Sequence, residues 1–441
     1  MADLDVIVIG TGVAGASVAA GCAAAGLRVA VTDRVPYGGT CAQRGCDPKK
    51  VLLAASEVVG RFQALAGRGL EGEMRVAWSE LMRRKREFVA DVPERTEARL
   101  RDAGATRLHG EARFVDADVV EIGGRRLRGG AIVIATGAAP RHLGVPGQDL
   151  VVHSDAFMDM DELPPRVIFV GGGYISFEFA ALARRAGSDV TIVHRSSRVL
   201  KEFDADLTAA LVDRYRDLGI RVLLDAPTIE VRRHEDALFL RTPHEDLVAD
   251  LVVHGAGREP DLEGLDLAAA GVAVGARGVL VDAQLRSTSN PSVFAAGDAA
   301  AIGLPLTPAA SRQARVVVET ILGRRAAYDP RATASVVFSD PPLAQVGMTA
   351  AEGASRNDVQ IVSTDMSGWL TTRRLGLTHA AAKVVREEAS HKLLGAQLLG
   401  ANAEDVINVF ALAVRHGLTT EEVADAVWAY PTASSDIGYL V

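Results

Sequence analysis

The stretch DVIVIGTGVAG, residues 5–15, is an apolar run that leads into three glycines at GxGxxG spacing, Gly10, Gly12 and Gly15. A segment of helical character follows, and then a short strand, RVAVTD, that ends at Asp33. In such a unit the glycines admit a pyrophosphate, the helix N-terminus faces the phosphates and the carboxylate takes the ribose hydroxyls. We therefore predict a dinucleotide site. The alternative is a glycine-rich loop that only packs a helix on a sheet.

The same unit recurs at RVIFVGGGYIS, residues 166–176. Gly171 and Gly173 match the first unit, while Ser176 stands where a third small residue is expected. A helical segment and a strand, DVTIVHR, follow. We therefore predict an α/β fold with two Rossmann-like dinucleotide-binding domains.

The two units differ where the second strand ends. The spacing that leads from Gly10 to Asp33 leads here from Gly171 to His194, so the second unit has no carboxylate at this point. A carboxylate repels a ribose 2′-phosphate, whereas cationic side chains pair with it. The cations offered here are Arg195, Arg198 and Lys201. We predict FAD at the first site and NADPH at the second. A solvated basic loop is the alternative reading of the cations.

The segment GGTCAQRGCDPKK, residues 38–50, holds Cys41 and Cys46. The third cysteine, Cys22, lies in an apolar helical stretch and is predicted to be buried. Three cysteines are too few for a secreted disulfide framework. A zinc site needs further ligands, and no second cysteine pair or HxxxH supplies them. The close pair therefore indicates redox chemistry, and we predict no metal site.

Net charge and hydropathy restrict the kinds of binding partner that we expect. A net charge of −8 gives no basic surface of the kind that nucleic acid requires. No apolar run approaches the roughly 20 residues that span a bilayer. The start, MADLDVIVIG, enters a strand without a basic leader or a cleavage site. We expect a cytoplasmic protein that binds neither nucleic acid nor membrane.

The remaining segments complete the predicted organisation. Residues 110–137 alternate like a small antiparallel meander and end in an ATG turn, and the Pro- and Gly-rich stretch 140–150 resembles a domain boundary. A later strand presents Asp298, and a helix is expected directly after Thr307 as its N-cap. From about residue 331 the pattern predicts a separate α+β domain.

These motifs, in this order, resemble the family of glutathione reductase, dihydrolipoamide dehydrogenase and mercuric reductase, the class I pyridine nucleotide-disulfide oxidoreductases. The redox segment is similar to the family's GGTCxxxGCxPxK, and the resemblance covers essentially the whole chain. Further matches are ATG at 135–137, GAGREPD at 255–261, VFAAGD at 293–298, LTP at 306–308 and FSDPPLAQVGMT at 338–349.

The resemblance implies a homodimer that acts on a small molecule. FAD would bind to residues 1–149 and 255–330, NADPH to residues 150–254, and residues 331–441 would form the C-terminal dimerisation domain. NADPH would reduce FAD, and FAD would reduce a Cys41–Cys46 disulfide. By family position, Cys46 is the thiol that faces the flavin as a charge-transfer thiolate, and Cys41 is the exposed interchange thiol. Four intervening residues fit one helical turn, which would bring the two sulfurs close.

Other site residues are also implied by the resemblance. Asp298 would hold the ribityl chain, and the helix near Thr307 would face the flavin's pyrimidine end. Tyr174 would cover the nicotinamide pocket. Glu178 would pair with a lysine beside the flavin, and the PKK doublet leaves either Lys49 or Lys50 for this role; an ordinary core tyrosine and a surface ion pair are the alternatives. The set of cofactor-binding residues extends to Gly39, Thr40, Ala112, Thr136, Gly137 and Gly257.

The sequence departs from the family at its C-terminal end. Disulfide reductases of the family end in a segment like HPTxSE, whose His protonates the leaving thiolate. Here the segment is AYPTASSD, with Tyr430 at the His position, Ser435 at the Glu position and Asp436 beside it. A phenol, with a pKa of about 10, matches thiol chemistry poorly at neutral pH.

Other departures from the family's sequence pattern also leave the final electron acceptor open. No cysteine follows Cys46, and Ala20 stands where glutathione reductases place an arginine. Arg44 and Asp47 stand where the family usually has apolar residues. Arg44 should favour the thiolate of Cys46, and Asp47 should disfavour it. Two kinds of electron acceptor then remain. The first is a small disulfide, with Tyr430 or water as a slow acid. The second is a quinone, an electrophile or a metal ion such as Hg(II). A flavoprotein that senses redox state through a partner is the alternative of another class.

Overall fold

The computed structural model describes residues 2–441, which form two compact units. The first unit contains the chain up to Lys50, Arg84–Arg141 and Arg258–Pro330. The second contains Val51–Arg83, His142–Gly257 and Arg331–Val441. Two helices, α3 (Cys46–Leu65) and α4 (Trp78–Val89), continue from one unit into the other.

The first unit is built on a seven-stranded sheet in the order β3-β2-β1-β6-β5-β4, to which β18 adds by pairing with β6. The parallel pairs in this sheet are β2–β3, β1–β2, β1–β6 and β6–β18. The antiparallel meander expected from the sequence is formed by β4, β5 and β6. The elements are β1 (Ala2–Ile9), α1 (Val13–Ala24), β2 (Val29–Asp33), α2 (Gly39–Arg44), α5 (Val92–Asp102), β3 (Thr106–His109), β4 (Ala112–Asp116), β5 (Val119–Ile122), β6 (Arg125–Ile134), β7 (Ala138–Pro140), β15 (Arg258–Pro260), β16 (Val274–Gly275), β17 (Gly278–Val279), β18 (Val293–Ala295) and α9 (Thr307–Ile321).

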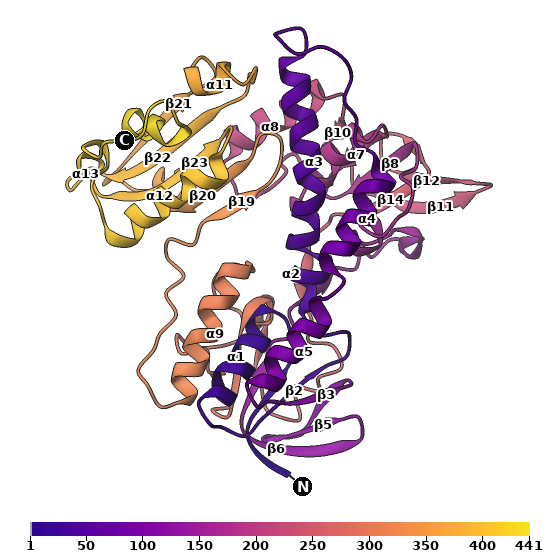
Figure 1. Cartoon of the computed structure of the whole chain (residues 1–441), viewed down its shortest axis with the longest axis vertical. Coiled ribbons are helices and arrows are strands. Elements are labelled where there is room, and N and C mark those ends of the chain that lie inside the picture. The colour runs from indigo at the N-terminus through magenta and orange to yellow at the C-terminus, as the bar shows by residue number, and fades with distance from the viewer. Residues whose placement is uncertain (1) are drawn as a thin grey trace. The chain divides into compact units, whose positions relative to one another are not determined.

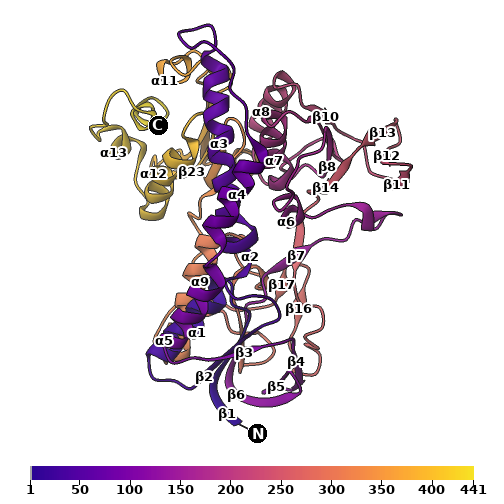
Figure 2. The same cartoon turned by 45° about the vertical axis from the view of Figure 1, so that its right-hand side comes forward.

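Helices cover one face of this sheet. α1 packs against both α9 and α5, and Figures 1 and 2 show α9, in orange, beside the indigo α1 although the two lie far apart in sequence. Val6, Ile7 and Val8 of β1 are all buried, because a parallel strand inside such a sheet is covered on both faces. The carboxyl ends of β1, β6 and β18 therefore share one edge, where ligands bind in doubly wound folds.

The second unit contains two main sheets. The first is parallel, in the order β10-β9-β8-β14, and carries α7 against its strands. A three-stranded meander, β11-β12-β13, belongs to the same part of the chain. The elements are α6 (Ser154–Phe157), β8 (Arg166–Val170), α7 (Tyr174–Arg185), β9 (Asp189–Val193), α8 (Ala205–Asp217), β10 (Arg221–Leu223), β11 (Glu230–His234), β12 (Ala237–Arg241), β13 (Asp246–Ala249) and β14 (Leu251–His254).

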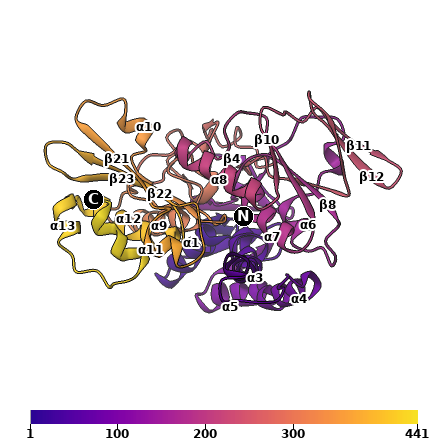
Figure 3. The ribbon, with the colours of Figure 1, turned by 90° about the horizontal axis from the view of Figure 1, so that it is seen from above.

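The C-terminal sheet is antiparallel, in the order β19-β20-β23-β22-β21. α12 packs on β20 and β23, and Figure 3 shows α12 beside β23. This is the α+β domain that the sequence pattern predicts from about residue 331. Its elements are β19 (Ser335–Val337), β20 (Leu343–Gly347), α10 (Ala350–Gly353), β21 (Val359–Asp365), α11 (Leu370–Arg373), β22 (Ala381–Glu387), β23 (Leu393–Leu399), α12 (Ala403–His416) and α13 (Thr420–Ala424).

Within residues 2–441, no helix combines the length and the apolar character that crossing a membrane requires.

Candidate dinucleotide and dithiol sites

The first glycine loop leaves no space for side chains at two of its glycines. A Cβ on Gly10, whose φ is +104°, would lie 2.3 Å from the Ala135 carbonyl oxygen. A Cβ on Gly15 would lie 2.0 Å from the Gly10 carbonyl oxygen. At Gly12, by contrast, Gly39 Cα is the one described heavy atom within 4 Å, at 3.8 Å. The loop is thus closely packed on its sheet side and open at Gly12, where a pyrophosphate would approach.

Asp33 is bound to this loop. Its Oδ2 accepts hydrogen bonds from the backbone N–H of Thr11 at 2.8 Å and from the Thr11 hydroxyl at 2.6 Å. The Thr11 hydroxyl also accepts from the N–H of Gly38, at 3.2 Å. Sequence reasoning missed Thr11; a polar residue inside GxG, with a carboxylate at the end of the next strand, was the available signal.

The sheet edge of the first unit carries two polar groups, Thr136 and Asp298, that suit a flavin dinucleotide. Within the described part of the chain, the buried Oγ1 of Thr136 has no hydrogen-bond partner, so a bound cofactor could satisfy it. Burial raises the pKa of Asp298, while the guanidinium of Arg258 opposes that shift. The N–H of Gly297 donates to the side chain of Gln313 at 2.7 Å, a positioning contact that the sequence motifs did not reveal. Of the other predicted residues, Thr40 lies in α2, Ala112 in β4, and Gly137 after β6 with a φ of +75°.

Cys41 and Cys46 lie on either side of a helix break. Cys41 belongs to α2, and Cys46 is the first residue of α3. Between them, Gly45 has φ −136° and ψ −120°, and a Cβ there would lie 2.7 Å from the Thr40 carbonyl oxygen. The prediction of a single helical turn is therefore wrong. The prediction that the sulfurs are close is confirmed, since the two free thiols hydrogen bond with one another.

Polar groups surround the Cys41 thiol. The Thr307 hydroxyl donates to Cys41 Sγ at 3.1 Å and lies 3.9 Å from Cys46 Sγ. The Cys41 thiol faces the Asp47 carboxylate at 3.9 Å. The hydrogen bond with Cys46 and burial raise the pKa of Cys41, while the bond from Thr307 lowers it. Cys41 therefore holds its proton more tightly than an ordinary cysteine.

Thr307 does not have the capping role expected from the sequence. α9 begins at Thr307, and its N-cap is Leu306, which makes no side-chain cap bond. The prediction of Thr307 as N-cap is thus wrong by one residue, and its hydroxyl bonds to Cys41 instead. The N-terminus of α9 nonetheless lies at the dithiol.

The second glycine loop is built like the first. Gly171 has a φ of +111°, and a Cβ there would lie 2.3 Å from the Gly255 carbonyl oxygen; at Gly173 the corresponding distance is 3.2 Å. Ser176 is fully buried, and its Oγ would lie 2.0 Å from a Cβ on Gly255. Gly255 is therefore the residue that admits Ser176 in place of a third glycine, and sequence reasoning missed it. Gly257 has a φ of +102°, and a Cβ there would meet no heavy atom of the described residues within 4 Å.

Tyr174 and Glu178 both contact the segment around β19. The Tyr174 hydroxyl hydrogen bonds with Ser335 Oγ at 2.7 Å, and burial raises the pKa of Tyr174 to about 12. Oε1 of the buried Glu178 accepts the N–H of Phe338 at 3.0 Å. Lys49 and Lys50 lie in the first turn of α3, in the first unit, and the choice between them as partner of Glu178 stays a prediction.

The predicted 2′-phosphate cations differ in their surroundings. The guanidinium of Arg198 donates to the carbonyl oxygens of Lys201 and, at 3.3 Å, of Phe203. Arg195 and the side chain of Lys201 are exposed. Arg198 therefore organises the loop, and Arg195 and Lys201 are the cations available to a ligand.

The description "Pyridine nucleotide-disulphide oxidoreductase" belongs to a family model that matches residues 4–314, and the dimerisation domain of the same family matches residues 333–440. The chain belongs to this family. The predicted family and fold class, with two Rossmann-like domains and a C-terminal dimerisation domain, are thus confirmed.

Relatives of different activities are similar to the chain. A glutathione reductase of Burkholderia cepacia is 30% identical over 98% of this chain and 97% of its own. A mercuric reductase of Staphylococcus aureus is 29% identical over 99% of this chain and 81% of its own. The Cu(II) complex of RclA, a HOCl-induced flavoprotein disulfide reductase from Escherichia coli, matches with a TM-score of 0.89 and 28% identity over 100% of this chain and 99% of that chain.

Family membership confirms the general activity. This pyridine nucleotide-disulphide oxidoreductase is an FAD-dependent enzyme that uses a pyridine nucleotide and acts on disulfides, with a small-molecule substrate. Its dimerisation domain makes it a homodimer.

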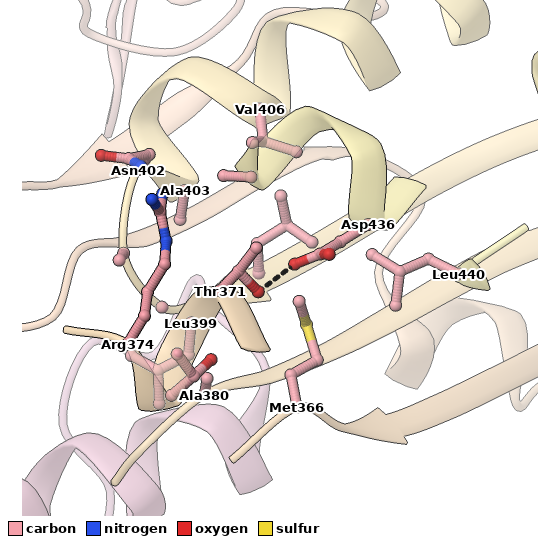
Figure 4. Close-up of a pocket in the computed structure, with 15 residues that line it drawn as sticks. Met366, Thr371, Arg374, Ala380, Leu399, Asn402, Ala403, Val406, Asp436 and Leu440 are labelled. Carbon is pink, nitrogen blue, oxygen red and sulfur yellow. Dashed lines mark hydrogen bonds between the residues drawn. The ribbon is translucent and has the colours of Figure 1, made fainter. Parts of the chain in front are cut away.

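The two polar residues near Tyr430 in the C-terminal segment of this oxidoreductase are both engaged elsewhere. Tyr430 itself is 73% exposed. Ser435 exchanges hydrogen bonds with Thr432 in a capping box. Asp436 is buried and accepts the hydroxyl of Thr371 in a pocket of the C-terminal domain, as Figure 4 shows. Asp436 therefore binds within its own domain and does not replace the missing Glu.

Proposed function

We propose that the enzyme takes electrons from NADPH and delivers them, through FAD and the Cys41–Cys46 pair, to a small acceptor. The contact between the two thiols carries this proposal, because adjacent sulfurs can close a disulfide with little backbone movement. When bound, FAD accepts a hydride from the nicotinamide and supplies two electrons to the disulfide. The open Gly12 and the unsatisfied Thr136 hydroxyl support the first unit as its site.

The choice of NADPH rests on charge. The second unit lacks a carboxylate where Asp33 closes the first, and exposed Arg195 and Lys201 follow in the loop. Cationic side chains favour a 2′-phosphate, which NADPH carries and NADH lacks. Tyr174 is proposed to cover the nicotinamide, and Glu178 to pair with Lys49 or Lys50.

The dithiol exchanges electrons in two displacements. The Cys41 sulfur attacks a substrate disulfide, and the first substrate thiol leaves. The Cys46 sulfur then attacks Cys41, which closes the Cys41–Cys46 bond and releases the second thiol. The two protons of the pair end on the two product thiols. Thr307 assists the first step, because its hydrogen bond favours the Cys41 thiolate.

A metal ion is the second candidate acceptor. The raised pKa of Cys41 and the phenol at position 430 both disfavour thiol–disulfide exchange at neutral pH. A similar mercuric reductase and the Cu(II) complex of the similar RclA support a metal ion as substrate. One Hg(II) or two Cu(II) ions would take up the two electrons that the dithiol gives when its disulfide forms.

We also propose the binding segments predicted from the sequence. Residues 1–149 and 255–330 would bind FAD, residues 150–254 would bind NADPH, and residues 331–441 would form the interface between subunits. The family-model boundary between residues 314 and 333 supports the last division. We further propose a cytoplasmic location, where NADPH is supplied and free thiols stay reduced.

Anaerobic titration tests the donor and the dithiol together. The purified enzyme is titrated with NADPH and with NADH, and turnover is then measured with glutathione disulfide, lipoamide, quinones, Hg(II) and Cu(II). We expect faster reduction by NADPH, with a long-wavelength thiolate–flavin band that is lost in Cys46→Ser and kept in Cys41→Ser. Faster reduction by NADH would overturn the donor assignment. Rapid turnover of a disulfide alone would exclude the metal acceptor.

A further inference from the structure

Asp47 places a negative charge directly beside the Cys41 thiol. Its Oδ1 lies 3.9 Å from Cys41 Sγ, and the thiol faces this oxygen. Asp47 is exposed, and so is Cys46, the residue before it. The carboxylate therefore lies next to the sulfur that is proposed to attack the acceptor, on a part of the first unit that a small molecule can reach.

The local backbone explains how a carboxylate comes to this position. α3 begins at Cys46, so Asp47 lies in the first turn of the helix, where a negative charge is stabilised. Pro48, which follows, is tolerated in a first turn. The break at Gly45 separates this turn from α2, which carries Cys41. The side chain of Asp47 thus meets a thiol that belongs to the preceding helix.

The carboxylate acts on the thiol through its charge. The hydrogen bond with Cys46 and burial are the larger causes of the raised pKa of Cys41, and the negative charge of Asp47 adds to them. A charge that disfavours a thiolate at this sulfur also acts on any charged group that an acceptor brings to it. It attracts a cation and repels an anion.

The cations nearest in sequence do not cancel this charge by direct pairing. Arg44 ends α2, and within residues 2–441 it forms no ion pair with Asp47. Lys49 and Lys50 are half-buried, and the Nζ of Lys50 is buried, whereas Asp47 is exposed. An acceptor that approaches Cys41 therefore meets a negative charge beside the sulfur.

We propose that Asp47 selects cationic acceptors for the dithiol and disfavours anionic ones. The inference rests on the proposed transfer of electrons from the Cys41–Cys46 pair to a small acceptor, and it adds the charge of that acceptor. A disulfide with ammonium groups close to its sulfurs, such as cystamine, has this chemistry, and so does a divalent metal ion.

The two cationic classes take up the same two electrons. With cystamine, the pair closes its own disulfide and its two protons end on the two cysteamine thiols. With metal ions, the pair closes its disulfide, one Hg(II) becomes Hg(0) or two Cu(II) become two Cu(I), and the two protons go to solvent. Glutathione disulfide, which carries a net negative charge, should be the poorer acceptor.

Reagents that differ in charge measure this selection at Cys41 alone. The reduced Cys46→Ser enzyme is treated with 2-aminoethyl, 2-hydroxyethyl or 2-sulfonatoethyl methanethiosulfonate, whose side groups are cationic, neutral and anionic. In each case the Cys41 sulfur forms a disulfide with the reagent, methanesulfinate leaves and the thiol proton goes to solvent. The remaining cysteine, Cys22, is fully buried. We expect Asp47→Asn to lower the ratio of the cationic to the anionic rate constant about fivefold or more at low salt.

The ratio of two rate constants is independent of the pKa of Cys41, because both reagents meet the same thiol. Asp47→Glu, which keeps the charge, should keep the parent ratio. Rising salt should bring the ratio of the parent toward that of D47N, because salt screens exposed charges. Equal ratios in the parent and D47N at low salt would overturn the role of Asp47.

Turnover then identifies the cationic acceptor. The holoenzyme and its D47N variant are supplied with NADPH and with cystamine, the neutral 2-hydroxyethyl disulfide, the anionic 3,3′-dithiodipropionate, Cu(II) or Hg(II). We expect kcat/KM for cations, relative to the neutral disulfide, to fall about threefold or more in D47N. A fall for cystamine alone would assign the site to disulfides, and a fall for metal ions alone would assign it to metals. Turnover of no acceptor would overturn the proposed function, whereas the reagent ratios test Asp47 independently of turnover.

Discussion

Thr307 is a residue whose hydroxyl lies close to both thiols. Its hydroxyl donates to Cys41 and lies near Cys46, although 266 residues separate it from Cys41 in sequence. The motif LTP indicated a helix start but not this contact, because spacing within a motif carries no information about distant partners. The local glycine constraints of Gly10 and Gly171 were predictable, and the sequence also held a signal for Thr11. Gln313 and Gly255 were not predictable, since each acts across the fold.

Thr307→Val should slow the reaction of Cys41. The substitution keeps the shape of the side chain and removes the hydroxyl that favours the thiolate, so the pKa of Cys41 should rise further. The check is the pH dependence of alkylation of the reduced enzyme by iodoacetamide, in a Cys46→Ser background. Thr307→Ser, which keeps the hydroxyl, should behave like the parent. An unchanged profile in T307V would show that the hydrogen bond has no effect on the thiol.

Among the helices and strands, the break between α2 and α3 is the feature that could not be predicted from the sequence. A spacing of four residues is compatible with one helical turn, and only the backbone at Gly45 shows that two helices meet there. The parallel sheet, the meander and the C-terminal domain were predictable, because long apolar runs and alternation report local structure. The boundary of α9 was off by one residue, since capping depends on contacts that the pattern does not contain.

Gly45→Ala should disturb this break. The new Cβ would lie 2.7 Å from the Thr40 carbonyl oxygen and 3.0 Å from Cys41 Cα, and both are backbone atoms that cannot turn aside. We expect a loss of about 1–3 kcal/mol in the free energy of unfolding and slower closure of the Cys41–Cys46 disulfide. Urea unfolding and thiol titration after oxidation measure the two effects. Gly368→Ala is the control, because within residues 2–441 no heavy atom beyond the adjacent residues lies within 4 Å of its Cβ position.

The packing of the C-terminal segment on α11 should depend on pH through Asp436. Burial raises the pKa of Asp436 in the native state, so the folded protein binds this proton more tightly than the unfolded chain. The stabilising contribution is full below the unfolded pKa of about 3.9 and is lost as pH rises through the higher native pKa. Asp436→Asn should therefore raise the unfolding midpoint at pH 7, and the gain should shrink toward pH 4. Thermal unfolding scans of both proteins between pH 4 and pH 7 measure this gain in the unfolding midpoint. A gain that grows toward low pH would contradict the prediction.

In the homodimer, the absence of a histidine at position 430 limits which electron acceptors the enzyme can reduce. Tyr430→His would replace a phenol by an imidazole, the side chain that ordinarily gains and loses its proton near neutral pH. We expect turnover of glutathione disulfide to rise about tenfold or more, with little change in the rate of flavin reduction by the nucleotide. Tyr430→Phe tests the phenol itself, and slower turnover in this variant would show that Tyr430 acts as the slow acid. No gain in Y430H would mean that the acceptor site lacks other features of a disulfide reductase.

The first unit is assembled from three separate stretches of the chain, and this has a consequence for its biosynthesis. β18 completes the sheet and α9 brings Thr307 to Cys41 only after some 300 residues have been translated. Until then the nascent chain carries its two reactive thiols without the hydroxyl and helix end that later control them. At translation rates of about 5–20 residues per second, that interval lasts tens of seconds. During synthesis Cys41 and Cys46 are therefore two thiols that lack the contacts made by Thr307 in the folded unit.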